Sequence, residues 1–477
     1  MRIAAAREGA LMGRPVGTAV IEARVGSRLR SPYRRRLARR RSRAFSGEHT
    51  GLPAMALPLL VGAALLCSSA VAQTHLFVDD AGIARKENVV RRAHACEKLP
   101  EPVLEPEAPW ERDGIDERVY IYGTVLRDPD TGRFRMWYNR LDLVLYATSK
   151  DGLHWDRPKL GRYEFDGSKE NNIVYPGLHS PSVVYNPDAK PDYRYTLLGY
   201  TRKPERGCYA LHSPDGIHWT LYPENPVFIG GDTCTLTHDP ATGRYFVYAK
   251  RTEKHRGHER RLVYAASSPD MQDFTEPVLA MAPDATDDAL VRAEGGQFAQ
   301  FYNMSVFPYG GLFLGFVTHF RYSGAPERTG PVQSPHDGPI DVQLAYSRDG
   351  FDWSRCEDRS PVIPNGPHAY DQGCILGLAT APVFVEDEVW LYYTAITTPH
   401  GGFLPEKRIT LALAKWRRDG FVSLDAGEEA GIVETVPRNL ANKRLTVNAD
   451  AANGALTVAM LGTDGAPVPG YAHGDCV

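Results

Sequence analysis

Apolar and polar positions alternate along the chain in short runs, and each run ends at a turn signal. Five segments combine one such run, an Asp-Gly type turn and a second run that opens with an aromatic residue. Their turn aspartates are Asp151, Asp215, Asp270, Asp349 and Asp419, spaced 64, 55, 79 and 70 residues apart. This pattern is typical of a β-hairpin. The third copy lacks the glycine, and the fifth lacks the aromatic residue four positions after the aspartate.

A second hairpin pattern precedes each copy. These upstream hairpins cover residues 128–138, 186–195, 239–248, 308–314 and 386–393. Two consecutive hairpins form a four-stranded antiparallel unit that buries both faces only by stacking on its neighbours. Five such units predict an all-β fold, a five-bladed β-propeller over residues 113–424. No long segment shows a convincing helical period.

The residues on either side of the predicted propeller show a different sequence pattern. Residues 73–112 are expected to form an N-terminal arm that packs on the propeller. Residues 425–477 return to short alternating strands, one pair split by Asn453-Gly454, and predict a C-terminal β-strand segment resembling part of a sandwich. Some 50 residues supply too few strands to close a sandwich. Two interpretations remain open: a truncated second module, or strands that pack on the propeller.

The first 72 residues predict targeting, as a basic extension followed by a signal peptide. Arginines crowd the segment before an apolar run at 57–66, and Ala70-Val71-Ala72 matches a cleavage pattern of small residues. The run is too short to span a bilayer. A secreted or periplasmic protein is therefore expected. The alternatives are an uncleaved anchor, an organellar transit peptide, and a translation start at Met55.

Charge narrows the class of ligand. The 477 residues carry a net charge of −3, but the first 50 contain 13 Arg against three Glu, so the chain from Gln73 onward carries about −13. Such an acidic body argues against nucleic-acid binding and suits neutral ligands. The six cysteines after the signal show no Cys-x-x-Cys spacing. They are expected to be mostly buried thiols, with one or two disulfides left open.

Candidate catalytic residues are the acids that precede the first strand of each predicted blade, because a propeller binds ligands in the funnel where these strands begin. They are Glu117 beside Asp116 in blade one, Asp232 in blade three, Glu294 in blade four and Asp371 in blade five, while blade two offers only His179. Glycosidic cleavage needs one proton donor and one base or nucleophile. We expect Asp232 and Asp371 to face one funnel, with Glu117 or Glu294 as the donor.

Structural roles compete with these assignments. Asp232 and Asp371 fit strand caps as well as funnel acids, and Glu117 and Glu294 fit structural roles. The Asp-Gly aspartates are expected to form turns. Packing roles are expected for Trp155, Trp219, Trp353, His179, His319 and His400. The pair Arg260-Arg261 is predicted to be a solvated face.

Residues 151–161 and 165–174, together with 344–350 and 419–427, resemble exported bacterial proteins of the five-bladed β-propeller glycosidase superfamily. That group includes glycoside hydrolase families thirty-two and forty-three. The resemblance runs from Leu76 to the C-terminus and implies an acid pair with a third, stabilising carboxylate. Gly231-Asp232 and Tyr370-Asp371 match the inner-strand acids of the group. The invertase motifs Trp-Met-Asn-Asp-Pro-Asn-Gly and Glu-Cys are absent, so fructosidase activity is not expected.

These observations predict a secreted glycoside hydrolase that acts on a neutral poly- or oligosaccharide by carboxylate acid/base chemistry. The alternative is a non-catalytic propeller that binds glycans. A sialidase is weaker, because its Asp-box needs a residue between Asp and Gly. The expected partner is a carbohydrate, with no nucleic acid and no membrane after signal cleavage. No cofactor is expected, and a structural metal ion is left open. Three carboxyl groups within about 10 Å in one pocket would favour the enzyme.

Overall fold

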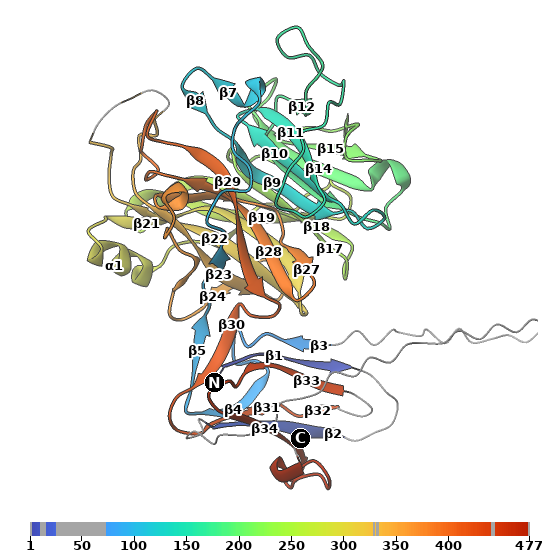
Figure 1. The fold of residues 1–477 in the computed structure, drawn as a ribbon, viewed down its shortest axis with the longest axis vertical. Coiled ribbons are helices and arrows are strands. Elements are labelled where there is room, and N and C mark those ends of the chain that lie inside the picture. The colour runs from blue at the N-terminus through green and yellow to red at the C-terminus, as the bar shows by residue number, and fades with distance from the viewer. Residues whose placement is uncertain are drawn as a thin grey trace, which may run out of the picture.

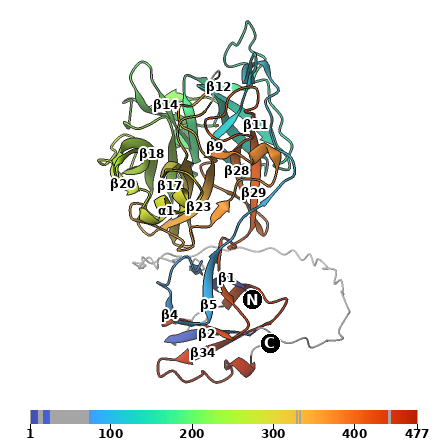
Figure 2. The same cartoon turned by 90° about the vertical axis from the view of Figure 1, so that its left-hand side faces the viewer.

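The computed structural model describes residues 2–9, 16–24, 73–327, 330, 333–439 and 444–475. Two units of β-sheet make up the molecule (Figure 1). The larger lies above and the smaller, which holds both chain ends, lies below. Figure 2 shows the same division after a quarter turn.

The larger unit contains three regular four-stranded antiparallel sheets. Blade one is β9 (Tyr120–Arg127), β10 (Phe134–Arg140), β11 (Leu143–Ser149) and β12 (Ile173–Pro176). Blade two is β13 (His179–Tyr185), β14 (Tyr195–Thr201), β15 (Gly207–Ser213) and β16 (Thr220–Leu221). Blade three is β17 (Cys234–Asp239), β18 (Arg244–His255), β19 (His258–Ser268) and β20 (Val278–Met281).

Two further blades complete the larger unit. Blade four is β21 (Phe298–Tyr309), β22 (Leu312–Tyr322) and β23 (Ile340–Ser347), whose outer edge pairs with β24 (Trp353–Arg355) and β25 (Pro361–Ile363). Blade five has β26 (Cys374–Leu378) and β27 (Val383–Val385) on β28 (Glu388–Ile396), followed by β29 (Ile409–Arg417) and β6 (Glu97–Lys98). The inner strands contact one another in the order β9, β13, β17, β21, β26 and back to β9. The predicted five-bladed propeller is confirmed.

The fifth repeat differs from its prediction. β29 ends before the turn at Asp419, and the chain then leaves the propeller as β30 (Val422–Ala426). The outer strand of blade five is instead β6, from the N-terminal side of the propeller, which pairs antiparallel with β29. The missing aromatic residue after Asp419 is consistent with this, because no fourth strand follows to need it. Strands from both ends of the repeat region thereby close the ring.

The predicted Asp-Gly turns share one hydrogen-bond pattern. In four blades an Asp carboxylate accepts from the backbone amides two and three residues later, and a Ser hydroxyl two residues earlier donates to it. The four aspartates are Asp151, Asp215, Asp270 and Asp349. Met271 takes the place of glycine in the third copy, at a φ of 71°. The copy that lacks glycine therefore keeps the left-handed turn, in a backbone conformation that residues with a side chain seldom adopt.

These turns also join neighbouring blades. The carbonyl groups of Gly152, Gly216 and Gly350 each accept a hydrogen bond from an aromatic side chain of an adjacent blade. Trp155 packs edge-on against Tyr392 of blade five, and Trp353 does the same against Tyr248 of blade three. The turns of blades one, two and four therefore each contact a neighbouring blade, and Trp155 and Trp353 pack as predicted.

The smaller unit is a sandwich of two five-stranded sheets. One contains β3 (Gln73–His75), β1 (Arg2–Gly9), β30, β5 (Val89–Ala93) and β33 (Arg444–Asp450). The other contains β32 (Arg438–Asn439), β2 (Val16–Arg24), β31 (Gly431–Thr435), β4 (Ile83–Glu87) and β34 (Ala455–Gly462). Residues 425–477 thus obtain their missing strands from the N-terminal part of the chain.

Two predictions for the N-terminal region need correction. The arm expected at 73–112 does not pack wholly on the propeller, since β4 and β5 pair with β31 and β30 in the sandwich. Residues 2–9 and 16–24, which the sequence assigns to a basic targeting extension, are strands of the same sandwich. Each pairs with strands on both of its sides, β1 with β33, β3 and β30 and β2 with β34, β31 and β32. The predicted apolar run and cleavage pattern fall in residues 25–72, outside the described part of the chain.

The remaining elements are short. The helix α1 (Ala285–Ala293) lies before blade four, and β7 (Arg112–Asp113) pairs with β8 (Asp116–Glu117) before blade one. Single 3-10 turns are η1 (Pro109–Glu111), η2 (Pro191–Tyr193), η3 (Ala369–Asp371) and η4 (His473–Asp475). The five cysteines among the described residues are free thiols, four of them buried. Cys476 lies outside the described residues.

Candidate functional site

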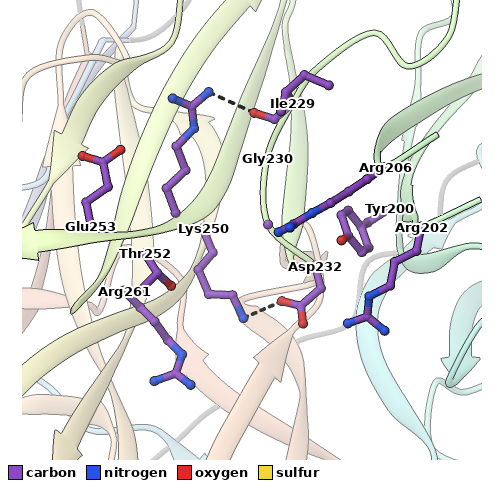
Figure 3. A pocket seen from close by; sticks show the side chains of 12 residues that line it. Tyr200, Arg202, Arg206, Ile229, Gly230, Asp232, Lys250, Thr252, Glu253 and Arg261 are labelled. Carbon is purple, nitrogen blue, oxygen red and sulfur yellow. Dashed lines mark hydrogen bonds and ion pairs between the residues drawn. The ribbon is translucent and has the colours of Figure 1, made fainter. Parts of the chain in front are cut away.

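A cavity of about 600 Å³ lies between blades two and three, at the end of the propeller where the inner strands begin. We call it the Asp232 pocket (Figure 3). Blade two contributes the end of β14 and the loop that follows it, and blade three contributes the approach to β17 and the hairpin of β18 and β19. The lining residues are Tyr200, Arg202, Arg206, Ile229, Gly230, Gly231, Asp232, Lys250, Arg251, Thr252, Glu253 and Arg261.

Asp232 is held in this pocket by the backbone on both sides of it. The amide of Gly231 donates to the carbonyl of Lys250 at 2.8 Å, and the amide of Lys250 donates to the carbonyl of Thr233 at 3.1 Å. A side chain at position 231 would place its Cβ 2.4 Å from the Lys250 carbonyl oxygen. Only glycine permits this close approach, so Gly231 fixes where Asp232 lies.

Asp232 and Lys250 form an ion pair, with 2.5 Å between Oδ1 and Nζ. The Asp232 side chain remains 38% exposed, whereas that of Lys250 is 9% exposed. The ammonium also lies 4.0 Å from the centre of the Tyr302 ring, in a cation–π contact. Two charges and an aromatic face from blades three and four thus meet at the mouth of the funnel.

The charge state of Asp232 restricts its chemistry. Partial burial alone would raise its pKa, but the Lys250 ammonium outweighs burial, and with the fields of His179 and Arg202 it lowers the pKa to about 2. The group is therefore a carboxylate at neutral pH. It can act as a base, a nucleophile or an ion-pair partner, and it is unsuited to donate a proton.

His179 and two tyrosines of blade one lie next to this charge pair. The His179 ring packs against Tyr122 with centroids 5.4 Å apart and against Tyr120 at 6.4 Å. Burial among these rings lowers the pKa of His179, which favours the neutral imidazole at neutral pH. The packing role expected for His179 is therefore present, at a position near Asp232.

Asp371 does not reach the pocket. Its side chain is fully buried, and Oδ2 lies 2.5 Å from the ammonium of Lys98 on β6. The Tyr393 hydroxyl donates to the same oxygen at 2.9 Å. Lys98 also donates to the carbonyl groups of Pro364 and Gly366. These contacts place Asp371 inside the wall formed by blade five and its closing strand, away from solvent.

Glu117 and Glu294 lie at the surface, with side chains 49% and 57% exposed. Glu117 is 3.6 Å from Arg112, and Glu294 is 2.7 Å from Arg321. In the Asp116-Glu117 pair it is Asp116 that is buried, where it pairs with Arg118. Of the four predicted acids, only Asp232 lines the pocket.

The functional residues that the sequence analysis missed are basic side chains of blade three. Arg260-Arg261, predicted to be a solvated face, is not one: Arg260 is 1% exposed and pairs with Asp288 at 2.5 Å, and Arg261 lies over the Tyr302 ring. β18 and β19 have 12 and 11 residues, longer than the strands of blades one and two. The polar residues at the tip of this hairpin, where β18 ends and β19 begins, were the sequence signal that could have indicated an extension lining a ligand site.

The other two candidate histidines are packed inside the protein. His319 lies 3.5 Å from Asp341, and both are buried. Burial, followed by the charges of Lys407, Arg261 and Lys250, lowers the pKa of His400 to about 3. Among the described residues, no three His, Cys, Asp or Glu side chains are grouped as a metal site would require.

No protein family matches the chain, and no curated protein sequence matches it. Among solved structures, a thermostable family-43 glycoside hydrolase has a TM-score of 0.44 at 13% identity, over 64% of this chain and 92% of its own. An N-acetylgalactosamine deacetylase from F. plautii has 0.43 at 16% identity, over 69% and 96%. An α-L-arabinofuranosidase from Podospora anserina has 0.42 at 11% identity, over 69% and 98%.

Likeness at this level assigns no function, so the function has to be inferred from the side chains of this chain. In the part of the chain that the structure describes, no helix is long and apolar enough to cross a membrane.

Proposed function

We propose that this chain is a carbohydrate-active propeller and that a glycan binds in the Asp232 pocket. The observation that carries the proposal is the partly exposed, ionised Asp232 at the start of an inner strand, fixed by Gly231 and Lys250 beside a cavity of about 600 Å³. A cavity of this size accommodates a few sugar rings. Asp232 is also one of the two acids that match the glycosidase resemblance, and the other, Asp371, does not line the pocket.

Hydrolysis of a glycosidic bond is the reaction that we propose for the enzyme. Asp232 would serve as base or nucleophile, because its low pKa keeps it ionised. The other carboxylate that lines the pocket is Glu253, which accepts a hydrogen bond from the Tyr264 hydroxyl at 2.6 Å. It lies three residues after Lys250 on β18, so the two side chains emerge from opposite faces of the strand. A proton donor for hydrolysis would therefore have to come from elsewhere or from a rearranged Glu253.

A binding protein without catalysis is the second candidate. It is favoured by the placement of Asp371, Glu117 and Glu294, none of which lines the pocket with Asp232. Both candidates use the same residues to hold the glycan, and they differ only in whether a bond breaks.

One panel separates the two candidates. The protein and its Asp232→Asn variant are tested against neutral and acidic oligosaccharides for both binding and release of reducing ends. Cleavage that Asp232→Asn abolishes supports the hydrolase, and binding without cleavage supports the binding protein. Cleavage at the parental rate by Asp232→Asn would contradict the assignment of the site, and no binding to any glycan would contradict the function.

Export is a separate proposal, supported by the arginine-rich start and the cleavage pattern at Ala70-Val71-Ala72. N-terminal sequencing of secreted protein should give a start near Gln73. Cleavage there would also remove β1 and β2 from the sandwich. Recovery of an intact arginine-rich segment from the secreted fraction would contradict the proposal.

A further inference from the structure

The Asp232 pocket carries more positive than negative charge. Its lining contains five cationic side chains, Arg202, Arg206, Lys250, Arg251 and Arg261, and two acidic ones, Asp232 and Glu253. The chain from Gln73 onward carries a net charge of about −13. A cluster of cations on an acidic body is therefore a local feature of this pocket, and it does not follow from the overall composition.

Two of these cations are already engaged by the protein. Lys250 pairs with Asp232 at 2.5 Å. The Arg251 guanidinium donates to the carbonyl of Ile229 at 2.9 Å and packs over the rings of Phe228 and Tyr264. These contacts fix both side chains in place.

Arg202, Arg206 and Arg261, like Arg251, have no carboxylate within ion-pair distance among the residues that the structure describes. Arg261 donates to the Gln300 amide oxygen at 2.9 Å, which is a neutral acceptor. Arg202 and Arg206 follow β14 in the loop of blade two and are exposed. In Figure 3 Arg202 lies beside Asp232 on the blade-two side, and Arg261 lies beside Lys250 on the opposite side. Cations from two blades thus flank Asp232.

We infer that the Asp232 pocket binds an anionic group, and that its ligand is a glycan that carries carboxylate, sulfate or phosphate. Guanidinium groups bind such oxyanions through paired N–H donors, and a cavity lined by cations concentrates anions near its mouth. The inference rests on the proposed function, and it replaces the neutral glycan expected from the sequence with an acidic one. In this arrangement Asp232 contacts the sugar hydroxyl groups, and the arginines bind the anionic group of the glycan.

The test compares oligosaccharides that differ only in charge. Oligogalacturonate is set against its methyl ester, and a sulfated carrageenan oligosaccharide against its desulfated form, with inorganic phosphate and sulfate as free anions. Binding is measured by calorimetry at low salt and again at higher salt. The acidic member of at least one pair should bind about tenfold or more tightly than its neutral counterpart, and added salt should weaken it.

Matched variants assign the effect to the pocket. Arg202→Gln and Arg206→Gln should each weaken binding of the acidic probe by about tenfold, the loss of one charged hydrogen bond. Arg133→Gln is the control, since it removes the same charge from an exposed residue of the hairpin turn between β9 and β10. An equal loss in Arg133→Gln, or none in the pocket variants, would overturn the inference.

The outcomes also separate this inference from the proposed function. Neutral glycans that bind as tightly as acidic ones would overturn the anionic ligand and leave a glycan-binding propeller. Phosphate or sulfate that binds through Arg202 and Arg206, with no glycan binding at all, would support the anion site and contradict the glycan function. No binding by any anion at low salt would overturn the anion site.

Discussion

Asp232 and Asp371 both precede an inner strand of the propeller, and each carboxylate lies 2.5 Å from a lysine ammonium. The lysine of the first pair lies on the neighbouring strand of the same blade, and that of the second comes from the strand that closes the ring. Asp371 is fully buried, whereas the Asp232 side chain is 38% exposed. Identical pair chemistry therefore serves ring closure at one site and an open cavity at the other.

The surroundings of the two pairs explain the difference. Lys98 donates to two backbone carbonyl groups besides Asp371, and Tyr393 donates to Asp371, so protein groups satisfy the buried charges. Charges taken out of water need such partners. Among the described residues, the Lys250 ammonium contacts only the Tyr302 ring besides Asp232, and the partly exposed carboxylate is open to solvent or a ligand. The two ion pairs have the same N–O distance. The exposure of the aspartate side chain therefore distinguishes the structural pair from the candidate ligand site.

The largest expected effect comes from breaking the buried pair. Lys98→Met should leave Asp371 as an uncompensated buried charge and lower the free energy of unfolding by about 3–5 kcal/mol. Glu97→Gln, at the exposed neighbouring position on β6, is the control and should stay within about 0.5 kcal/mol of the parent. Urea unfolding measures both. A Lys98→Met protein as stable as the control would mean that the pair does not hold the ring closed.

A smaller loss is expected at the glycine that positions the exposed pair. Gly231→Ala places a Cβ 2.4 Å from the Lys250 carbonyl oxygen, so the backbone must shift at a cost of about 1–3 kcal/mol. Glycan binding should weaken as well, because Asp232 moves with the backbone. Gly427→Ala has open space around it and is the control in both thermal unfolding and binding. Unchanged binding in Gly231→Ala would show that the position of Asp232 does not matter.

Removing the exposed carboxylate should separate stability from binding. Asp232→Asn should change the free energy of unfolding by no more than about 1–2 kcal/mol, much less than Lys98→Met, while it abolishes or strongly weakens the response to glycan. Thermal unfolding with and without glycan measures both quantities. A loss of stability comparable to that of Lys98→Met would mean that both aspartates serve the fold.

The smallest effect concerns pH. The pKa of Asp232 is lowered from about 4 in the unfolded chain to about 2 in the fold. The unfolded state therefore binds more protons between these values, and the contribution of the carboxylate to stability is present above pH 4 and lost as the pH falls toward 2. Acid unfolding of Asp232→Asn should show a shallower decrease in that window than the parent. Parallel curves would contradict the lowered pKa.

Local chemistry made part of the structure predictable. The turns at Asp151, Asp215 and Asp349 depend on a carboxylate and amides two and three residues away, so they are written in contiguous residues. Their recurrence was sufficient to predict five blades. Met271 shows the same rule, since the hydrogen bonds of its turn persist without glycine.

Tertiary structure decided which acid meets the cavity. Asp232 and Asp371 have similar sequence contexts. The lysine that pairs with Asp371, however, is 273 residues away, on the strand β6 that closes the ring by pairing with β29. The cations of the Asp232 pocket come from two blades and from the far part of a long hairpin, so no single segment contains the pattern. Burial and net local charge are sums over neighbours in space, and for this reason the sequence determined the blades while the folded chain determined the site.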